Sequence, residues 1–339
     1  MKAYEMGDQQ GLASLRLAER ADPVASPGQV LLRVRIVCLN HRDLLALSGS
    51  YGPRRPEQRI PVSDGVGEII ALGEGVQGFK PGDRAIAPHF AGWTGGDWSP
   101  AHLGQDLGIS QDGWLAERVV VPADALVRLP DGMSDEQAVA LPAAGLTAWQ
   151  ALVHLGRIKA GDLVLTLGTG GVSILALQLA KMHGARVAIT SSSDEKLAQM
   201  RALGADITIN YRSQPDWAAA LLQASGGAGA DIVVETGGLG TLGLSIAAAA
   251  PKGRIVLIGA LGSAGAPGLG NLSGIVVKNL QLMGVTSGSR AMLAELVRAA
   301  AASQMQPVIH RSFGFDEAPA AYAYLKSGEH IGKIMIRVG

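Results

Sequence analysis

The sequence predicts an α/β protein that combines a doubly wound parallel sheet with a mainly antiparallel β domain. Its 339 residues exceed what a single hydrophobic core usually carries, so we expect two domains. Apolar residues make up 47% and charged residues 17% of the chain, which is enough to fill two large cores. The region 29–128 is typical of short strands and turns, whereas the region after Ser134 alternates strand-like and helix-like segments.

The antiparallel domain is predicted from four strand-like stretches. In the first, QVLLRVRIV, Arg33 and Arg35 alternate with Val34 and Ile36, as in a strand with one buried face. The stretches GVGEIIALGEGV, FKPGDRAIAP and LAERVVVPADALVRLP follow, and the second of these contains a Pro-Gly-Asp turn. Short strands at this spacing are typical of a compact, barrel-like domain. The region 92–113 lacks periodicity, so we expect a long surface loop there, of a length that is often functional.

The parallel sheet is predicted from Ser134 onward. Ser134 is placed to cap a helix, and Gln137 lies three residues later, as in a capping box. The apolar runs DLVLTLG, ARVAIT, ADITIN, ADIVVET and RIVLIGA then alternate with amphipathic segments, which indicates parallel strands with helices on both faces. We expect residues 128–305 to form this domain. Residues 306–339 should return to the first domain, residues 1–127, because the terminal KIMIRV strand needs a sheet to join.

Composition excludes several classes of protein. The formal net charge is zero and no basic stripe is visible, so we expect no nucleic-acid partner. A single cysteine rules out an intramolecular disulfide and fits a reducing compartment. The N-terminus lacks the apolar core of a signal peptide, and no stretch reaches the ~18 apolar residues that would span a bilayer. We therefore expect a soluble, cytoplasmic protein with no membrane partner.

The stretch LVLTLGTGGVSILALQLAK carries a dinucleotide-binding fingerprint between a strand and a helix. Its residues are Gly168, Thr169, Gly170, Gly171, Val172 and Ser173, and Ser173 stands where a third glycine is usual. The glycines permit a tight turn and let backbone N–H groups approach a pyrophosphate at the positive end of the helix. The alternative is a merely glycine-rich turn.

The end of the following strand favours NADP(H) as the cofactor. NAD-selective sites place an acid there, about 20 residues after the fingerprint, to bind the ribose 2′-hydroxyl. In this chain Thr190, Ser191, Ser192 and Ser193 fill that place. Hydroxyl groups followed by Lys196 suit a 2′-phosphate. The same residues also fit an exposed first helical turn with Ser193 as its cap, and the two interpretations coexist.

The residue types argue against a metal site. Cys38 is the only cysteine, and the seven histidines form no HxxxH, HxH or HExxH pair. Cys38 lies in an apolar alternation, where a lone cysteine is most often a small core residue. A zinc site built from Cys38, one distant histidine and a carboxylate is the alternative, and we expect no metal.

With both halves in view, the chain resembles the medium-chain dehydrogenase/reductase superfamily, most closely its zinc-free branch related to quinone oxidoreductases and often labelled alcohol dehydrogenase-like. The resemblance covers nearly the full length and rests on LNHRDLLALSGSYG, IPVSDGVGEIIALGEGVQGFKPGDR, LPAAGLTAWQAL, GTGGVSILALQLAK, LGADITINYR and GEHIGKIMIRV. It implies a GroES-like, mainly antiparallel β catalytic domain and a Rossmann dinucleotide-binding domain.

In zinc-using relatives the first catalytic ligand is a cysteine three residues before an aspartate, a place that Asn40 occupies ahead of Asp43. The second ligand falls at Ser63 and Asp64, and the third falls near Ala143 and Ala144. The region 92–113 also lacks the four cysteines of the structural zinc lobe. The resemblance therefore implies a dehydrogenase active-site segment without its metal chemistry.

The resemblance also assigns roles to residues. Asn40 and Tyr51 correspond to polar residues near the nicotinamide, and Asp43 to a support residue behind them; alternatively they are a turn residue, a loop tyrosine and a helix N-terminal charge. Lys196 and Tyr211 match the pair that grips the 2′-phosphate in NADPH-preferring relatives. The remaining cofactor contacts are expected at Thr147, Thr236, Gly237, Ile258, Gly259, Val285 and Thr286.

Three further residues stay outside this assignment. Asp64 is interpreted as structural rather than catalytic, and His41 as structural or supporting, with a proton relay as the alternative. Lys333 would either position a phosphate or cap a strand end.

These observations predict a zinc-independent NADPH-dependent reductase that passes hydride to an enone or a quinone, that is, to a small apolar carbonyl compound. Asn40 would donate a hydrogen bond to the carbonyl oxygen, and Tyr51 or a water would deliver the proton. Trp93 and Trp98 would stack on a flat substrate or only pin their loop.

The alternatives are metal-free alcohol–carbonyl interconversion and a non-catalytic NADPH-binding protein. The strand NLQLMGVT would be an exposed sheet edge, and its pairing with a second copy predicts a homodimer.

Overall fold

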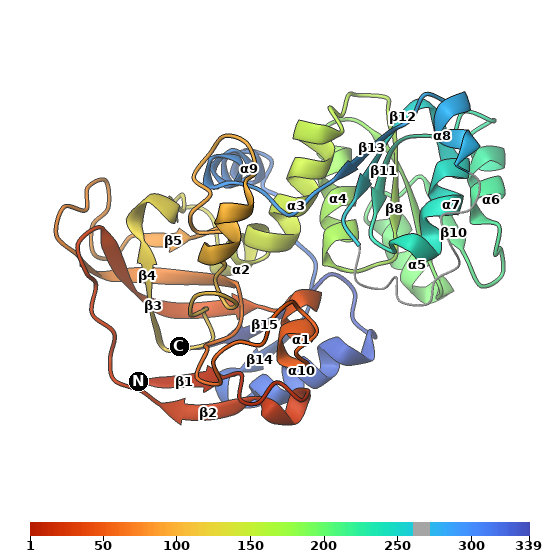
Figure 1. Ribbon diagram of the computed structural model, residues 1–339. Helices are drawn as coiled ribbons and strands as arrows, with labels where there is room; N and C mark the ends of the chain where they lie inside the picture. Colours follow the sequence, from red (N-terminus) through yellow and green to blue (C-terminus); the bar gives the residue numbers. More distant parts are fainter. Residues whose placement is uncertain (260–271) are drawn as a thin grey trace. The chain divides into compact units, whose positions relative to one another are not determined.

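The structure is a computed structural model that describes residues 1–259 and 272–339. The chain divides into two compact units, which are residues 1–146 with 288–339, and residues 147–287 (Figure 1). The expected boundaries at 127/128 and 305/306 therefore lie inside the first unit. The reason is packing, since the helix at 135–139 contacts the strands at 29–38 and 64–72, and the helix at 290–302 contacts residues 127–128 and 141–145.

The first unit is organised around a seven-stranded sheet that is mostly antiparallel, as predicted. Its order is β14-β15-β3-β4-β5-β7, and β6 pairs with β3. The terminal strand β15 joins this sheet, as expected, by antiparallel pairing with β3. The strands are β3 (Gln29–Cys38), β4 (Asp64–Leu72), β5 (Arg84–Ile86), β6 (Arg118–Pro122), β7 (Val127–Arg128), β14 (Ile309–Gly314) and β15 (Lys333–Arg337), with β1 (Lys2–Glu5) and β2 (Arg16–Glu19) as a separate pair.

Helices of the first unit cap and flank the sheet. They are α1 (His41–Leu47), α2 (Asp135–Val139), α9 (Arg290–Ala302) and α10 (Ala318–Ser327), with short 3₁₀ turns η1 (Leu12–Ser14), η2 (Pro100–Gln105), η3 (Ala123–Ala125) and η6 (Phe315–Glu317). The capping box at α2 is confirmed, because Gln137 N donates to Ser134 Oγ at 3.1 Å and Ser134 N donates to Gln137 Oε1 at 2.7 Å.

The helical segment that follows α2 is not one continuous helix. It continues as the π-helical turn η4 (Leu141–Gly145), a short α-helix α3 (Leu146–Trp149) and a second π turn η5 (Gln150–Leu155). Pro142 lies in the first of these turns and has no N–H to give to an α-helical ladder. The sequence pattern predicted a helix here, but it did not predict the change between α-helical and π-helical hydrogen bonding.

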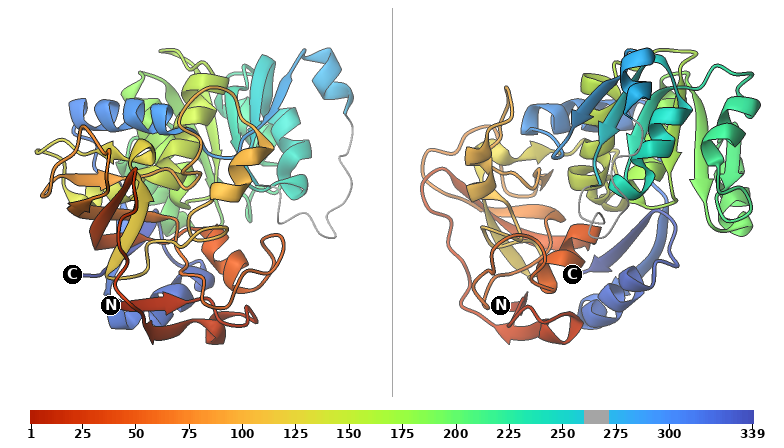
Figure 2. Two further views of the ribbon diagram at one scale, coloured as in Figure 1. Left: turned by 60° about the vertical axis from the view of Figure 1, so that its left-hand side comes forward. Right: turned by 45° about the vertical axis from the view of Figure 1, so that its right-hand side comes forward.

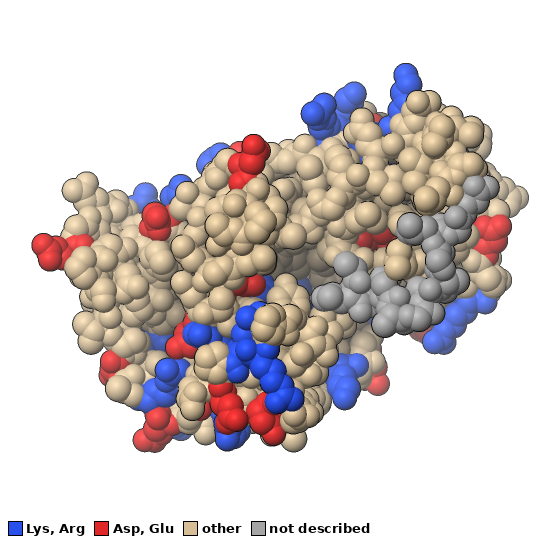
Figure 3. All heavy atoms as spheres, in the orientation of Figure 1, with Lys and Arg blue, Asp and Glu red and all other residues tan. Residues whose placement is uncertain are grey.

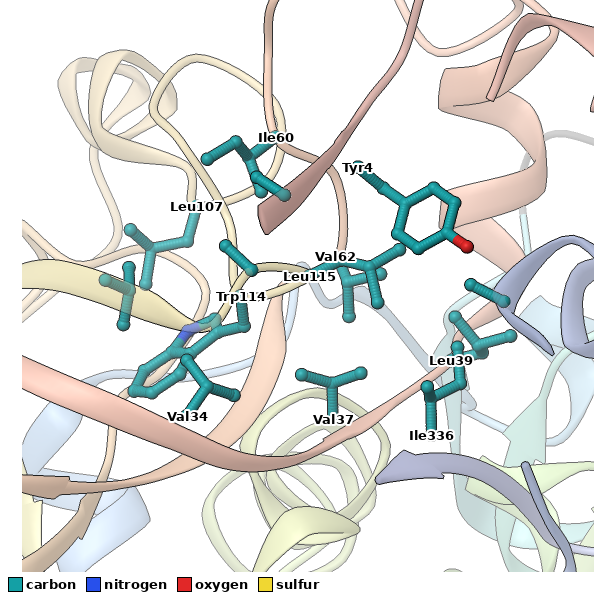
Figure 4. Close-up of a cluster of buried hydrophobic side chains, with 14 of the residues drawn as sticks. Tyr4, Val34, Val37, Leu39, Ile60, Val62, Leu107, Trp114, Leu115 and Ile336 are labelled. Atoms are coloured by element: carbon teal, nitrogen blue, oxygen red, sulfur yellow. The ribbon is translucent and has the colours of Figure 1, made fainter. Parts of the chain in front are cut away.

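The hydrophobic core of the first unit includes the large side chains of Trp114 and Tyr4 (Figure 4). Val34 and Val37 of β3 and Ile336 of β15 point into the same cluster. Close packing explains why β4 begins with small residues. A Cβ atom at Gly65 would lie 2.5 Å from Trp114 Cδ2, so only glycine lets the indole ring lie against this strand.

The region 92–113 differs from the expected surface loop. Trp93, Leu107 and Ile109 are buried, although residues 94–97 and 103–105 are exposed. The Trp93 indole donates from Nε1 to Gly96 O at 3.0 Å. The centres of the Trp93 and Trp98 rings lie 5.1 Å apart. The two tryptophans therefore pin this segment, which was one of the two expected roles.

The second unit is a doubly wound parallel sheet, as predicted. Its order is β10-β9-β8-β11-β12-β13, and all its pairings are parallel. The strands are β8 (Leu163–Leu167), β9 (Arg186–Ser191), β10 (Ile207–Asn210), β11 (Ala230–Glu235), β12 (Ala249–Leu257) and β13 (Gln281–Gly284). The order reverses between β8 and β11, which is the place where such sheets bind dinucleotides.

Helices cover both faces of this parallel sheet (Figures 1 and 2). They are α4 (Gly171–Met182), α5 (Asp194–Ala202), α6 (Trp217–Ala224), α7 (Leu239–Ala248) and α8 (Ser273–Val277). Helices α4 and α5 contact β8, β9 and β10, whereas α7 contacts β11 and β12 as well as α6 and α8.

Two surface properties bear on partners. On the face drawn in Figure 3, positive and negative side chains lie side by side over the lower part of the molecule, in keeping with the zero net charge. In the described part of the chain, no helix has the length and apolar character needed to cross a membrane.

We predict that Gly65→Ala destabilises the protein, because the added methyl group would overlap the Trp114 ring and force the strand or the ring to move. The free energy of unfolding, measured by urea denaturation, should fall by about 1–3 kcal/mol. Gly104→Ala is the matched control, since a Cβ there meets no atom within 4 Å. An equal effect of both substitutions would contradict this account of the core.

Candidate functional site

Three strand ends bring the predicted catalytic segment together in the first unit. The register pairs Cys38 of β3 with Asp64 of β4 on one side and with Met335 of β15 on the other. Continued two residues further, the antiparallel register of β15 places Lys333 opposite Asn40. Residues that are far apart in sequence therefore share one end of the sheet.

Asn40 is held by hydrogen bonds to two residues, Lys333 and Asp43. The ammonium of Lys333 donates to Asn40 Oδ1 at 2.5 Å and to Leu39 O at 2.7 Å, and Lys333 is only 3% exposed. Asn40 N donates to Asp43 Oδ2 at 2.7 Å. Within residues 1–259 and 272–339, the buried Nδ2 of Asn40 has no hydrogen-bond partner. The site thus contains a buried amide donor with two unused hydrogens.

Asp43 is buried and accepts the hydrogen bond from Asn40 N. Burial raises the pKa of Asp43 to about 7, and the negative charge of Asp64 raises it further, while Arg42, the Asn40 N–H and Lys333 act in the opposite direction. The carboxyl group also lies in the first turn of α1, which was the alternative helix N-terminal role.

Asp64 has a structural role in this arrangement, as interpreted from the sequence. It is fully buried, and it accepts hydrogen bonds from Ser63 Oγ at 2.8 Å and from Ala143 N at 3.2 Å. The carboxylate therefore ties the start of β4 to the π turn η4.

The donor set does not fit a catalytic zinc ion. The places of the three ligands hold Asn40, the hydrogen-bonded Ser63–Asp64 pair, and the side chains of Ala143 and Ala144. Nowhere in the described ranges do three or more His, Cys, Asp or Glu side chains gather at metal-binding distance. Cys38 is buried, and burial raises the pKa of its thiol to about 12, so it stays protonated at neutral pH.

A buried charged cluster next to this site was missed by sequence reasoning. Arg42 donates to both carboxylate oxygens of Asp106, at 2.7 and 2.6 Å, and His89 Nδ1 lies 3.1 Å from Asp106 Oδ1 and also contacts Arg42. The Arg42 guanidinium lies 5.0 Å from the centre of the Tyr51 ring. The cluster, which we call the Arg42 cluster, consists of Arg42, His89 and Asp106.

Burial and fixed charge shift the pKa values around the Arg42 cluster. Burial and the charge of Arg42 lower the pKa of His89, so this histidine is neutral at physiological pH. Burial raises the pKa of Asp106, but the charge of Arg42 and the hydrogen bonds from Arg42 and His89 outweigh this effect, so the net shift is downward. Burial raises the pKa of Tyr51 in spite of Arg42, so its hydroxyl keeps its proton. The sequence carried one signal for the Arg42 cluster, which was a charged residue next to apolar residues.

The fingerprint in the second unit fits a dinucleotide phosphate. Gly168 has a φ of 73°, and Gly170 is the N-cap residue of the twelve-residue helix α4, with no side-chain cap. A Cβ at either glycine would meet no atom within 4 Å, so the space beside the turn is open. Ser173 is buried and donates from Oγ to Leu167 O at 2.6 Å, which makes it a substitute for the third glycine.

The end of β9 carries the residues predicted to select the cofactor. Ser193 caps α5 as expected, since Lys196 N donates to Ser193 Oγ at 3.2 Å. The two acids that follow are already engaged, because Asp194 Oδ1 accepts from Asn210 Nδ2 at 2.9 Å and Glu195 Oε2 accepts from Ser193 Oγ at 2.5 Å. Ser191 ends β9, and Ser192 and the exposed Tyr211 follow the ends of β9 and β10.

The other predicted cofactor contacts mostly gather at the carboxyl ends of the strands. Thr236 Oγ1 donates to Leu167 O at 3.0 Å, and Ile258 N and Gly259 N donate to Glu235 O at 2.9 and 3.1 Å. Val285 N donates to Leu257 O at 3.1 Å, with Thr286 next to it, whereas Thr147 lies apart in α3.

Glu235 was also missed by sequence reasoning. It is fully buried, and its carboxylate accepts from Gly237 N at 2.7 Å, Gly238 N at 3.0 Å and the hydroxyls of Thr241 and Ser245. These four donors fix the turn after β11, which includes Thr236 and Gly237.

The comparisons with known proteins agree with this architecture. Residues 26–131 match the alcohol dehydrogenase GroES-like domain family, and residues 171–302 match the zinc-binding dehydrogenase family. A zinc-type alcohol dehydrogenase-like protein of Schizosaccharomyces pombe is 39% identical over 317 residues, which cover 92% of each chain. An acryloyl-coenzyme A reductase of Metallosphaera sedula is 31% identical over 349 residues, which cover 99% of each chain. A crystal structure of an NAD-dependent alcohol dehydrogenase superposes with a TM-score of 0.89 at 33% identity, with both chains covered completely (100%).

We predict that Asp106→Asn destabilises the protein strongly, because it leaves the Arg42 charge buried without its counter-ion. The loss should be about 3–5 kcal/mol in urea denaturation. Glu57→Gln removes the acid of the exposed Arg16–Glu57 ion pair and serves as the control, with little effect expected. A small loss for Asp106→Asn would mean that the cluster is hydrated rather than buried.

We also predict a pH dependence that comes from Asp43. Its pKa is raised in the folded protein from an ordinary value of 3.8, so the folded chain binds this proton more tightly than the unfolded chain. Its contribution to stability is therefore complete below pH 3.8 and is lost as the pH rises through about 7. Asp43→Asn should become progressively more stable relative to the wild type between these pH values, as measured by urea denaturation.

Asp124→Asn provides the control for this series. Asp124 is exposed, so its substitution should give a constant difference from the wild type at every pH. If Asp43→Asn also gave a constant difference, the raised pKa of Asp43 would be wrong.

Proposed function

The chain belongs to the medium-chain dehydrogenase/reductase superfamily and is an oxidoreductase, and we propose that it is a zinc-independent, NADP(H)-dependent reductase of activated C=C bonds. The proposed substrates are small apolar enones, enoyl thioesters or quinones. The acryloyl-coenzyme A reductase relative favours the enoyl class, since its named substrate is an enoyl thioester.

The buried Nδ2 donor of Asn40 is the observation that carries the proposal. When hydride adds to the β carbon of an enone, the electron pair of the C=C bond moves and negative charge develops on the carbonyl oxygen. A fixed donor in a water-poor site stabilises that charge better than water does, because it needs no reorientation. Asn40 offers such a donor, and Lys333 holds its amide in place.

The cofactor supplies the hydride when it is bound, and the protein has to supply the proton. Tyr51 is proposed as the proton donor to the α carbon, so that one hydride and one proton saturate the double bond. The raised pKa of Tyr51 keeps its hydroxyl protonated at neutral pH, and the Arg42 guanidinium over its ring fixes its position. A water molecule is the alternative donor.

The charge distribution after β9 favours NADP(H). Ser191 and Ser192 occupy the place of the acid that would bind a ribose 2′-hydroxyl, and Lys196 and Tyr211 are proposed to contact the 2′-phosphate. The hydrogen bonds of Asp194 to Asn210 and of Glu195 to Ser193 hold both carboxylates within the α5 cap. The expected cofactor contacts are otherwise those of the fingerprint and of the strand ends.

Alcohol–carbonyl interconversion is the second candidate. The NAD-dependent alcohol dehydrogenase structure and the zinc-type relative favour it. Polarising an unactivated carbonyl normally needs a metal ion, however, and the side chains at the ligand places are unsuited to zinc.

We further propose a homodimer. Strand β13 ends the order of the described parallel sheet and leaves one edge open for pairing. Val276 and Val277, the last two residues of α8 before this strand, are 76% and 78% exposed, and a second copy would cover them.

The test is a panel of initial rates with NADPH and with NADH on enones, quinones, acryloyl-coenzyme A, aldehydes and alcohols. We expect reduction of the activated C=C or quinone class, with NADPH preferred at least about tenfold. Asn40→Ala should lower kcat by about 10²–10³-fold, the effect of removing one oxyanion donor. Tyr51→Phe should lower kcat as well, whereas Tyr324→Phe on α10 should leave the rate unchanged.

Two results would redirect the assignment. Stoichiometric zinc in the purified protein together with alcohol oxidation would establish the alcohol dehydrogenase candidate instead. Tight NADPH binding without turnover of any panel member would identify a non-catalytic NADPH-binding protein.

A further inference from the structure

Lys333 contacts the Asn40 carboxamide from inside the protein, and the character of this contact extends the proposed mechanism. Its side chain is buried, and its ammonium donates to Leu39 O and Asn40 Oδ1. Lys333 and the carboxylates of Asp43 and Asp64 all act electrostatically on the buried Cys38 thiol. Lys333 and Asp64 also act on Asp43. A lysine is rarely buried this completely, because removing its charge from water is costly.

The chemistry of the two partners makes their contact directional. An ammonium group has three donors and no acceptor, whereas a carboxamide has one oxygen that accepts and one nitrogen that donates. The ammonium therefore stabilises only the amide rotamer in which Oδ1 faces Lys333. The opposite rotamer would place two donor groups against each other.

The consequence falls on Asn40 Nδ2. With Oδ1 committed to Lys333, the two N–H bonds of the amide point away from it, and this nitrogen is the buried atom that finds no acceptor in residues 1–259 and 272–339. A free carboxamide could turn over and present its oxygen instead. An oxygen in that place would repel a developing oxyanion.

We propose that Lys333 is a positioning residue that fixes the Asn40 carboxamide so that its N–H₂ group, and not its oxygen, faces the carbonyl oxygen of the substrate. This inference rests on the proposed role of Asn40 in hydride transfer. It differs from the two roles expected from the sequence. A phosphate contact would need an ammonium free to reach the cofactor, and a strand cap would not need the bond to Asn40.

The kinetic test compares three substitutions with different hydrogen-bonding character, assayed with NADPH and acryloyl-coenzyme A. Arginine only donates, glutamine both donates and accepts, and methionine does neither. We expect Lys333→Arg to keep most of the wild-type kcat and Lys333→Gln and Lys333→Met to lower it about tenfold or more, although glutamine is closer in size to lysine than arginine is. Lys326→Met, on the exposed end of α10, is the control and should change nothing.

A double substitution separates positioning from independent action. If Lys333 acts through Asn40, then Asn40→Ala with Lys333→Met should be no slower than Asn40→Ala alone. Multiplied effects of the two substitutions would overturn the proposal. So would a rise in KM for NADPH at unchanged kcat, which would make Lys333 a phosphate contact.

A second readout does not depend on turnover. The chain has only four asparagines, so selective ¹⁵N-asparagine labelling gives four side-chain amide signals, and Asn40→Ala assigns one of them. In the wild type the Asn40 pair should be sharp and slowly exchanging between its two N–H positions. In Lys333→Met it should shift and broaden, while the Lys326→Met spectrum matches the wild type.

The two readouts distinguish the possible failures. An unchanged Asn40 signal in folded Lys333→Met would overturn the positioning role even if the wild type is an active reductase. If the Asn40 signal changes in Lys333→Met but the wild type reduces no substrate, the proposed function is refuted and the positioning role of Lys333 stands. If Lys333→Met does not fold, Lys333→Gln supplies both measurements.

Discussion

The hydrogen bonds of one buried ammonium group organise the end of the sheet in the first unit. Lys333 begins β15, and its side chain reaches the last residues before α1, where it contacts Leu39 O and Asn40 Oδ1. The antiparallel pairing of β15 with β3 is what makes this reach possible. This charge stabilises the start of α1, the orientation of Asn40 and the environment of Asp43. Without it, each of them would face a carbonyl or carboxylate group that has no positive partner.

The same region shows how polar side chains can occupy a place that relatives use for a metal. Asp64 accepts from Ser63 and from the backbone of η4, and Cys38 is a protonated core residue. The carboxylates of Asp43 and Asp64 each accept hydrogen bonds from the protein itself. Lys333 contributes a positive charge to this region, on a group that donates hydrogen bonds and cannot act as a Lewis acid.

The sequence predicted the features that depend on local patterns. The parallel sheet, the fingerprint turn, the Ser134 and Ser193 caps and the return of the last strand follow from periodicity, turn residues and capping residues, all of which act over a few positions. The π turns after α2 were not predictable, because Pro142 signals a break without saying how the chain winds around it.

Contacts that join distant segments were harder to predict. The Lys333–Asn40 bond joins positions 293 residues apart, and the Arg42–Asp106 pair joins positions 64 apart. Strand register brings the first pair together, and burial between α1 and the region around Asp106 brings the second pair together. Neither pair leaves a local signal in the sequence. The unit boundaries at 146 and 288 were missed for the same reason, since α2 and α9 look like parts of the alternating region but pack on the antiparallel sheet.

The Arg42 cluster has a consequence for the segment between Gly92 and Gly113. Asp106 lies inside this segment and Arg42 lies on α1, so a buried ion pair fastens the segment to this helix. Chelators and thiol oxidants cannot break this ion pair, because it contains neither a metal ion nor a thiol. Strong acid does, because protonation of Asp106, whose pKa is depressed, removes the negative charge that neutralises Arg42. The anchor of this segment is thus indifferent to redox conditions and to metal supply, and it is released only at a pH well below that of the cell.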